Sequence, residues 1–197
     1  NCYSQQYGWV DMNANIPDID VTIRDVYAIG QEVWTAQRNG TNPNAIIFYS
    51  SDGGQTFIRQ TVPANSGTGM SIAMRSPQEG YLVTNYGRVL RTTDGGNNWI
   101  TIANGLGLLY SISFPPLPDT SGYICGGSGG KVCRVTDNTV TKELTMASTL
   151  TSIVFPSNSN EGWVCGGTVI RHRDSTGWHA DQYYSTGNWY NAIYFID

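Results

Sequence analysis

The sequence predicts an all-β protein folded as a β-propeller, and three observations lead to this prediction. A short apolar motif recurs at intervals close to 40 residues, a second motif follows it in constant phase, and a turn motif closes two of the repeats. Segments rich in Val, Ile, Tyr, Phe and Thr alternate with Gly, Asn and Asp, without the periodicity of an amphipathic helix. Repeats of about 40 to 45 residues with four short strands each are typical of propeller blades.

The first motif is expected to form the innermost strand of each four-stranded antiparallel blade. Its five copies are Asp25-Val-Tyr-Ala, Ser71-Ile-Ala-Met, Ser111-Ile-Ser-Phe, Ser152-Ile-Val-Phe and Ala192-Ile-Tyr-Phe. The last four copies start 40, 41 and 40 residues apart, and the first starts 46 residues before the second. This spacing predicts repeat units at residues 22–60, 68–105, 108–145 and 149–187.

The second motif is expected to form the next strand of each blade. It occurs as Glu32-Val-Trp, Gly80-Tyr-Leu, Gly122-Tyr-Ile-Cys-Gly-Gly and Gly162-Trp-Val-Cys-Gly-Gly. Third strands are predicted at Ile46 to Tyr49 and at Val89 to Arg91, each leading into a turn. The second motif follows the first in each of the four repeat units, which argues against a chance repeat.

The turn motif carries a resemblance to a known family. Ser50-x-Asp52-x-Gly54-x-Thr56-Phe57 and Thr92-x-Asp94-x-Gly96-x-Asn98-Trp99 resemble the Asp-box, or BNR repeat, of sialidases, sortilin-type receptors and xyloglucan-hydrolysing enzymes. The longer segment from Gly80 to Trp99 most resembles the propeller family of photosystem II assembly and stability factors. The resemblance implies a propeller fold and a role in assembling a larger complex.

The turn motif has a structural explanation. An Asp in a tight hairpin accepts hydrogen bonds from backbone amides two or three residues further on, and the following Gly allows a positive φ. The aromatic ring at the end of the motif is expected to pack between sheets. These residues are therefore predicted to be structural rather than catalytic: Asp52, Gly54, Phe57, Asp94, Gly96 and Trp99.

The two termini are predicted to share one incomplete blade. Trp9 precedes Val26 by 17 residues, much as Phe57 precedes Ile72 by 15, which is the place of an outermost strand. Ala192 begins an innermost strand at the other end of the chain. We expect residues 1–15 and 188–197 to belong to the same blade, in a single domain that is part of a longer propeller.

Composition excludes several classes of partner. With 11 Lys and Arg against 15 Asp and Glu, the net charge of −4 gives no general footprint for nucleic acid or an anionic membrane. No stretch approaches the roughly 18 to 20 apolar residues of a membrane span. Few charges beside many Asn, Ser, Thr, Gly and Tyr residues fit a secreted, extracellular, periplasmic or organelle-lumen protein, in which Asn39 of Asn39-Gly-Thr would be a glycosylation candidate.

The four cysteines favour disulfides over a metal site. No two are spaced as C-x-x-C, and only two histidines are present, so we expect neither a metal nor another cofactor. A hairpin symmetric about residue 129 would place Cys125 opposite Cys133, which predicts a bridge between them. Cys165 would be a free buried thiol or would pair with Cys2.

A binding face follows from the predicted topology. Innermost strands start at the face where propellers usually bind partners, and the loops between second and third strands open there too. Six residues would make this surface basic and aromatic: Arg24, Arg38, Tyr86, Arg88, Tyr110 and Lys131. Arg and Tyr favour protein recognition, although ordinary solvated loops would contain the same residue types. The predicted function is a non-catalytic scaffold that binds a protein partner.

The alternative is a glycoside hydrolase of sialidase or xyloglucanase type, with a glycan as its ligand. Glycosidases need two carboxyl groups roughly 5 to 9.5 Å apart. With Asp52 and Asp94 assigned to turns, only Asp25 remains near the predicted face, and the Arg-Ile-Pro segment usual in sialidases does not occur. No catalytic residue is therefore predicted, and an enzyme would need acids from outside this segment.

Overall fold

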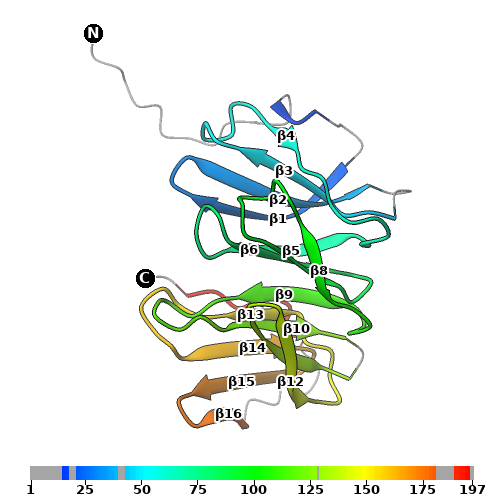
Figure 1. Cartoon of the computed structure of the whole chain (residues 1–197). Coiled ribbons are helices and arrows are strands. Elements are labelled where there is room, and N and C mark those ends of the chain that lie inside the picture. Colours follow the sequence, from blue (N-terminus) through cyan, green and yellow to red (C-terminus); the bar gives the residue numbers. More distant parts are fainter. Residues whose placement is uncertain (1–14, 18–20, 40–42, 128, 181–188, 196–197) are drawn as a thin grey trace.

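The computed structural model has four antiparallel sheets of four strands each, named blades I to IV in chain order. It describes residues 15–17, 21–39, 43–127, 129–180 and 189–195. Blade I lies at the top of the view and blade IV at the bottom (Figure 1). The predicted all-β fold of four-stranded antiparallel blades is confirmed.

The strands run in chain order from the inside to the outside of each blade. Blade I comprises β1 (Val21–Ile29), β2 (Glu32–Asn39), β3 (Ile46–Ser50) and β4 (Ile58–Arg59). Blade II comprises β5 (Gly69–Met74), β6 (Gly80–Thr84), β7 (Val89–Thr92) and β8 (Ile100–Ala103). Blade III comprises β9 (Leu109–Ser113), β10 (Gly122–Gly126), β11 (Lys131–Thr136) and β12 (Thr139–Thr145). Blade IV comprises β13 (Ser152–Val154), β14 (Gly162–Gly166), β15 (Val169–Asp174) and β16 (Gly177–Ala180).

Hydrogen bonds between successive innermost strands explain the first sequence motif. The side chain of the first residue of each motif accepts a bond from the backbone amide of the second residue of the next motif. The donor–acceptor distances are 2.9 Å for Ile72 to Asp25, 3.4 Å for Ile112 to Ser71, 3.4 Å for Ile153 to Ser111 and 3.3 Å for Ile193 to Ser152. Innermost-strand amides that face the preceding blade thereby keep a hydrogen-bond partner, which buried backbone groups require.

Aromatic packing forms a second contact at the same junctions. The Phe that ends a motif packs on the ring of the second strand in the preceding blade. The ring centroids are 5.2 Å apart for Tyr81 and Phe114, 4.8 Å for Tyr123 and Phe155, and 4.6 Å for Trp163 and Phe195. At the first junction, Trp34 and Met74 share one buried cluster in the same way.

Three copies of the second motif begin with glycine because the last residue of the first motif lies directly over that position. A Cβ atom at Gly122 would overlap the ring of Phe114, and one at Gly162 would overlap the ring of Phe155. A Cβ at Gly80 would overlap the sulfur of Met74. Glycine in a strand often marks such a close approach.

The two turn motifs form nearly identical hairpins. The Asp52 carboxylate accepts bonds from the Thr56 amide at 2.9 Å and the Thr56 hydroxyl at 2.6 Å. These bonds, with one from Ser50, lower the pKa of Asp52 to about 2. The amide of Gly54 donates to the Ser50 hydroxyl. The main backbone bond to Asp52 comes from Thr56, four residues further on, and the Gln55 amide, three residues on, contributes less.

The second hairpin repeats this pattern, and the two aromatic residues differ in depth. The amide and side chain of Asn98 donate to Asp94, and these bonds lower its pKa. Gly54 and Gly96 have φ values of 89° and 94°, which L side chains rarely adopt. Trp99 is buried between blades I and II, whereas Phe57 is only partly buried.

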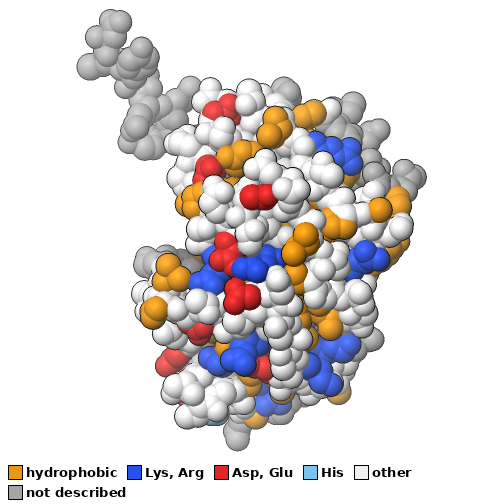
Figure 2. Space-filling view, viewed as in Figure 1, with side chains coloured by type: hydrophobic (Ala, Val, Ile, Leu, Met, Phe, Trp, Pro, Cys, Tyr) orange, Lys and Arg blue, Asp and Glu red, His pale blue; other side chains and the backbone are white. Residues whose placement is uncertain are grey.

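Blade III has no such hairpin, and an ion-pair cluster holds its turn to blade II. Arg91 donates to Glu79 at 2.9 Å, to Asp137 at 3.1 Å and to Asn138 at 2.9 Å. Its guanidinium also lies 5.7 Å from the ring centroid of Tyr81. Acidic and basic side chains gather at the level of this junction in Figure 2.

The prediction that Cys125 and Cys133 form a disulfide is wrong. Cys125 lies opposite Val132, and Cys133 lies opposite Ile124, so the two side chains point to opposite faces of the sheet. The hairpin centre lies half a residue from the expected position, and a shift of one residue in pairing reverses the face of a side chain. Cys125 packs towards blade IV and Cys133 towards blade II, and both thiols are free.

Cys165 is also a free and buried thiol. Burial raises the pKa of all three described cysteines, that of Cys165 to about 11. They therefore behave as small apolar core residues. Cys2, the other proposed partner of Cys165, lies outside the described residues.

Residues 189–195 lie against blade IV in the position that an innermost strand takes in the other junctions. Tyr190 donates its amide to the carbonyl of Gly167 at 2.7 Å, and Thr151 donates its hydroxyl to the carbonyl of Asn191 at 2.9 Å. Residues 1–14 of the proposed N-terminal part of the shared blade, Trp9 among them, lie outside the described residues. Asn15 is described, and its side-chain amide donates to the carbonyl of Gly54 at 3.1 Å. No helix in the described ranges is long and apolar enough to cross a membrane.

Replacement of Gly122 by alanine should destabilise the junction between blades III and II. The new Cβ would meet the Phe114 ring, and overpacking of this kind costs about 1 to 3 kcal/mol. Gly69→Ala is the matched control, because the nearest atoms to its Cβ would lie at 3.4 Å. Urea unfolding of both variants measures the difference, and equal free energies of unfolding would contradict the packing argument.

Replacement of Asp25 by serine should make blade I resemble the other blades and change the pH dependence of stability. Burial raises the pKa of Asp25 above its usual value, although Ser71 and two amides donate to its carboxylate. The free energy of unfolding of the wild type should therefore fall, relative to that of Asp25→Ser, as the pH rises from about 4 through the raised pKa of Asp25. We expect the advantage of Asp25→Ser to grow over that pH range in thermal unfolding.

Asp25→Ala serves as the control for this experiment. It leaves the Ile72 amide without its acceptor, which costs about 1 to 2 kcal/mol. A pH-independent difference between the wild type and Asp25→Ser would show that the buried charge has no influence on stability.

Candidate functional site

The loops of the four blades gather at two opposite ends of the sheets. We call one end the loop face, which holds the starts of the innermost strands and the loops between second and third strands. The other end is the hairpin face, which holds the connections between first and second strands and the hairpins between third and fourth strands.

Acidic side chains are strongly concentrated at one of these ends. Ten Asp and Glu residues are described, and only Asp25 and Glu143 lie within strands away from the hairpin face. The other eight lie at the hairpin face: Glu32, Asp52, Glu79, Asp94, Asp119, Asp137, Glu161 and Asp174. Among the described residues, the loop face consequently carries more basic than acidic side chains.

Topology puts the six predicted binding residues at or near the loop face. Arg24 lies at a bulge in the first half of β1, and Arg38 lies near the end of β2; both are exposed. Tyr86, in the loop between β6 and β7, is 56% exposed. Tyr110 lies in β9 and is partly buried.

The two remaining cations are anchored to backbone carbonyls. Arg88 donates to the carbonyl of Ala64 at 3.4 Å, in the segment that joins blades I and II. Lys131 donates to the carbonyl of Leu106 at 3.0 Å, in the segment that joins blades II and III. Each side chain therefore has a defined position, which reduces the entropy lost when a partner binds.

Asp25 is the acid that the sequence places near this face, and it has a structural environment. Its carboxylate accepts bonds from the Ser71 hydroxyl at 2.7 Å and from the amides of Ile72 and Val26 at 2.9 Å each. These contacts join blade I to blade II. No second described carboxylate shares this position, so Asp25 does not form a glycosidase pair with a described acid.

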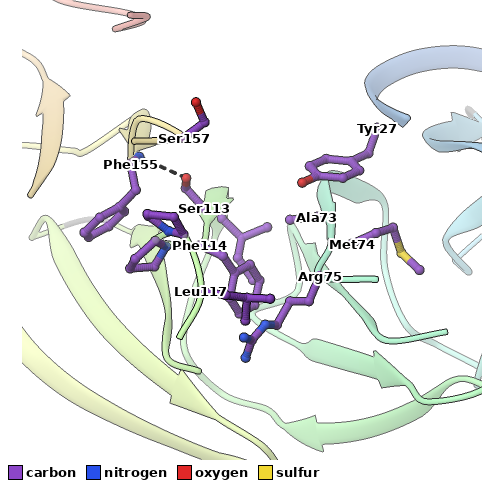
Figure 3. Close-up of a pocket in the computed structure, with 12 residues that line it drawn as sticks. Tyr27, Ala73, Met74, Arg75, Ser113, Phe114, Leu117, Phe155 and Ser157 are labelled. Atoms are coloured by element: carbon purple, nitrogen blue, oxygen red, sulfur yellow. Dashed lines mark hydrogen bonds between the residues drawn. The ribbon is translucent and has the colours of Figure 1, made fainter. Parts of the chain in front are cut away.

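A pocket of about 360 Å³ lies at the opposite, hairpin end of the innermost strands. Its walls come from all four blades, and Tyr27, Arg75, Phe114, Leu117 and Phe155 are among the lining residues (Figure 3). The sequence analysis missed this pocket, because its residues are spread over four repeats and share no motif. The run Phe114-Pro-Pro-Leu-Pro was the one local signal.

Arg75 is held rigidly beside this pocket. It donates to the carbonyls of Thr120 at 2.5 Å and Asp119 at 3.1 Å. Its guanidinium lies 5.3 Å from the ring centroid of Phe114. Arg75 therefore has a defined position in the pocket wall.

A second, polar hollow of about 310 Å³ lies between blades I and II. Two carboxylates line it, those of Glu32 and Asp94. Glu32 accepts a bond from the Tyr49 hydroxyl at 2.8 Å, and Asp94 is bonded within its own hairpin. Both acids thus already have partners within the protein.

The two histidines lie in blade IV. The Nε2 atom of His172 is 3.0 Å from Glu161, and that of His179 is 2.8 Å from Asp174. The ring of His172 also stacks on Trp163 at a centroid distance of 4.7 Å. His172 points away from its neighbours Arg171 and Arg173, and neither histidine lines the pocket shown in Figure 3.

Comparison with solved structures supports the propeller class. The chain resembles YCF48 bound to a D1 peptide, with a TM-score of 0.59 and 18% identity over 89% of this chain and 55% of that one. It also resembles a GH74 enzyme from Niastella koreensis, with a TM-score of 0.62 and 18% identity over 81% of this chain and 29% of that one. A third match is an ancestral GH74 enzyme, with a TM-score of 0.61 and 16% identity over 84% of this chain and 28% of that one.

At these identities the likeness shows the fold alone. The chain spans about half the length of the first structure and less than a third of the other two. No protein-family model matches the sequence, and no curated protein is significantly similar to it. The Asp-box resemblance accordingly stays a prediction that rests on the two hairpins.

Proposed function

We propose that this chain is a non-catalytic propeller scaffold that binds a protein partner through its loop face. The observation that carries the proposal is the separation of charge, because eight of the ten described acids lie at the opposite face. The loop face also offers arginine and tyrosine side chains, and these residue types are enriched at binding hot spots.

The proposed partner is a protein segment that carries acidic residues. Complementary charge speeds association and selects the orientation of the partner. The structural neighbour YCF48 is bound to a D1 peptide, and this supports a peptide or protein ligand rather than a small molecule. We further propose that the protein acts in a secreted, periplasmic or lumenal setting, in the assembly of a larger complex.

Selection from a random peptide display library on the wild-type protein tests this proposal. We expect acidic sequences to be enriched. These peptides should bind the double variant Arg24→Ala/Tyr86→Ala at least tenfold more weakly than the wild type, because each truncated hot-spot residue costs about 1 to 2 kcal/mol. Both residues are exposed, so the double variant should keep the melting temperature of the wild type.

Arg59→Ala is the matched control, because Arg59 is also exposed but lies in β4, the outermost strand of blade I. Binding that is equal in all three proteins would contradict the proposed face. Enrichment of basic sequences that bind at the loop face would do so as well.

A glycoside hydrolase is the second candidate function, supported by the two GH74 neighbours and by the polar hollow that Glu32 and Asp94 line. Release of reducing ends from xyloglucan oligosaccharides or from sialosides tests it. We expect none under the scaffold proposal. Hydrolysis that Glu32→Gln abolishes, without a change in melting temperature, would establish the enzyme.

A further inference from the structure

The pocket at the hairpin face presents an apolar surface to solvent. Leu117 is 73% exposed and Tyr27 is 36% exposed, although both are large apolar or aromatic residues at the mouth. Pro115 and Pro116 add flat, rigid rings to the wall next to Phe114. Exposed apolar hollows with a few polar groups are typical of binding sites.

The polar groups of the pocket favour one class of ligand. No carboxylate, carboxamide or histidine occurs among the described lining residues, so a sugar or nucleotide would find few of the partners that its many polar atoms need. Ser113 already accepts a bond from the Phe155 amide at 3.1 Å, and Arg75 already donates to two carbonyls.

Tyr27 is the group that can bind a ligand atom directly. Its hydroxyl points into the hollow in Figure 3, and none of the described residues forms a hydrogen bond with it. Burial raises the pKa of Tyr27, so the hydroxyl stays protonated and acts as a donor at neutral pH. A ligand with a carbonyl acceptor beside an apolar group satisfies both the hydroxyl and the walls.

Extended proline-containing peptides have this chemistry. In the polyproline II conformation the carbonyls make no internal hydrogen bonds and the rings project as flat apolar surfaces, which dock in hollows lined by aromatic residues. The acidic side chains of the hairpin face would attract Lys or Arg next to such a segment, above all Asp119, which forms no ion pair with a described cation.

We propose that this pocket is a second binding site, which takes an extended, proline-containing apolar peptide segment with basic flanking residues. The site lies at the other end of the sheets from the loop face and selects the opposite charge. It therefore goes beyond the proposed function and does not depend on it.

Fluorescence-anisotropy titration with a labelled peptide of two Pro-Pro-Leu-Pro segments, each preceded by Lys, tests the proposal. We expect saturable binding that is at least tenfold weaker when Glu replaces Lys and absent when Gly and Ser replace Pro and Leu. Tyr27→Phe should weaken binding about 3- to 10-fold, and Leu117→Ser about 5-fold or more, because a donor and an apolar contact are lost.

Tyr86→Ala is the control, since it removes an aromatic residue that is 56% exposed from the opposite, loop face and should leave the affinity of the pocket unchanged. Leu117 is exposed enough for its variant to remain folded, and melting curves verify this. The proposal would be overturned if the wild type showed no saturable binding or if the double variant Tyr27→Phe/Leu117→Ser bound the peptide as tightly as the wild type. Loss of binding in Tyr86→Ala would overturn it as well. Competition by a xyloglucan oligosaccharide for the same pocket would overturn it in favour of a glycan ligand.

Discussion

The contact between successive innermost strands determines the rest of this structure. At each junction a backbone amide of one blade bonds to a Ser or Asp side chain of the preceding blade, and a large side chain packs on that blade's second strand. The hydrogen bond fixes the height of one blade relative to the next, and the packing fixes their separation. Because the same contact recurs, all four blades point their loops in the same two directions.

This orientation also separates the charges. Tight hairpins use Asp side chains as hydrogen-bond acceptors for turn amides, and in the described part of the chain the hairpins that do so lie at the hairpin face. The basic residues of the second-to-third-strand loops lie at the other end. A protein with a modest negative net charge thus has two faces of different character, and the two proposed binding sites follow from this difference.

The strength of the sequence analysis was in repeating features, and its failures were in features that depend on one residue or on several blades. The spacing of Ser71, Ser111 and Ser152 predicted the strands, because the junction contact imposes one motif on every unit. The disulfide prediction failed because the register of the hairpin after Cys125 depends on the loop geometry, which a symmetric guess misplaced. The pocket lined by Tyr27 escaped notice because its walls meet only when four blades are assembled.

The sequence by itself determined the all-β class, the strand repeat and the residue types available to the loop face. These follow from local patterns, since alternation, turn residues and periodicity each reflect interactions within one unit. Only the tertiary structure decided that Asp25 joins two blades and that Arg88 and Lys131 are anchored to the segments between blades. It also decided that Cys125 and Cys133 lie on opposite faces of one sheet and remain free thiols. Those outcomes depend on contacts between residues distant in sequence or on an exact register, and packing of the blades settles both.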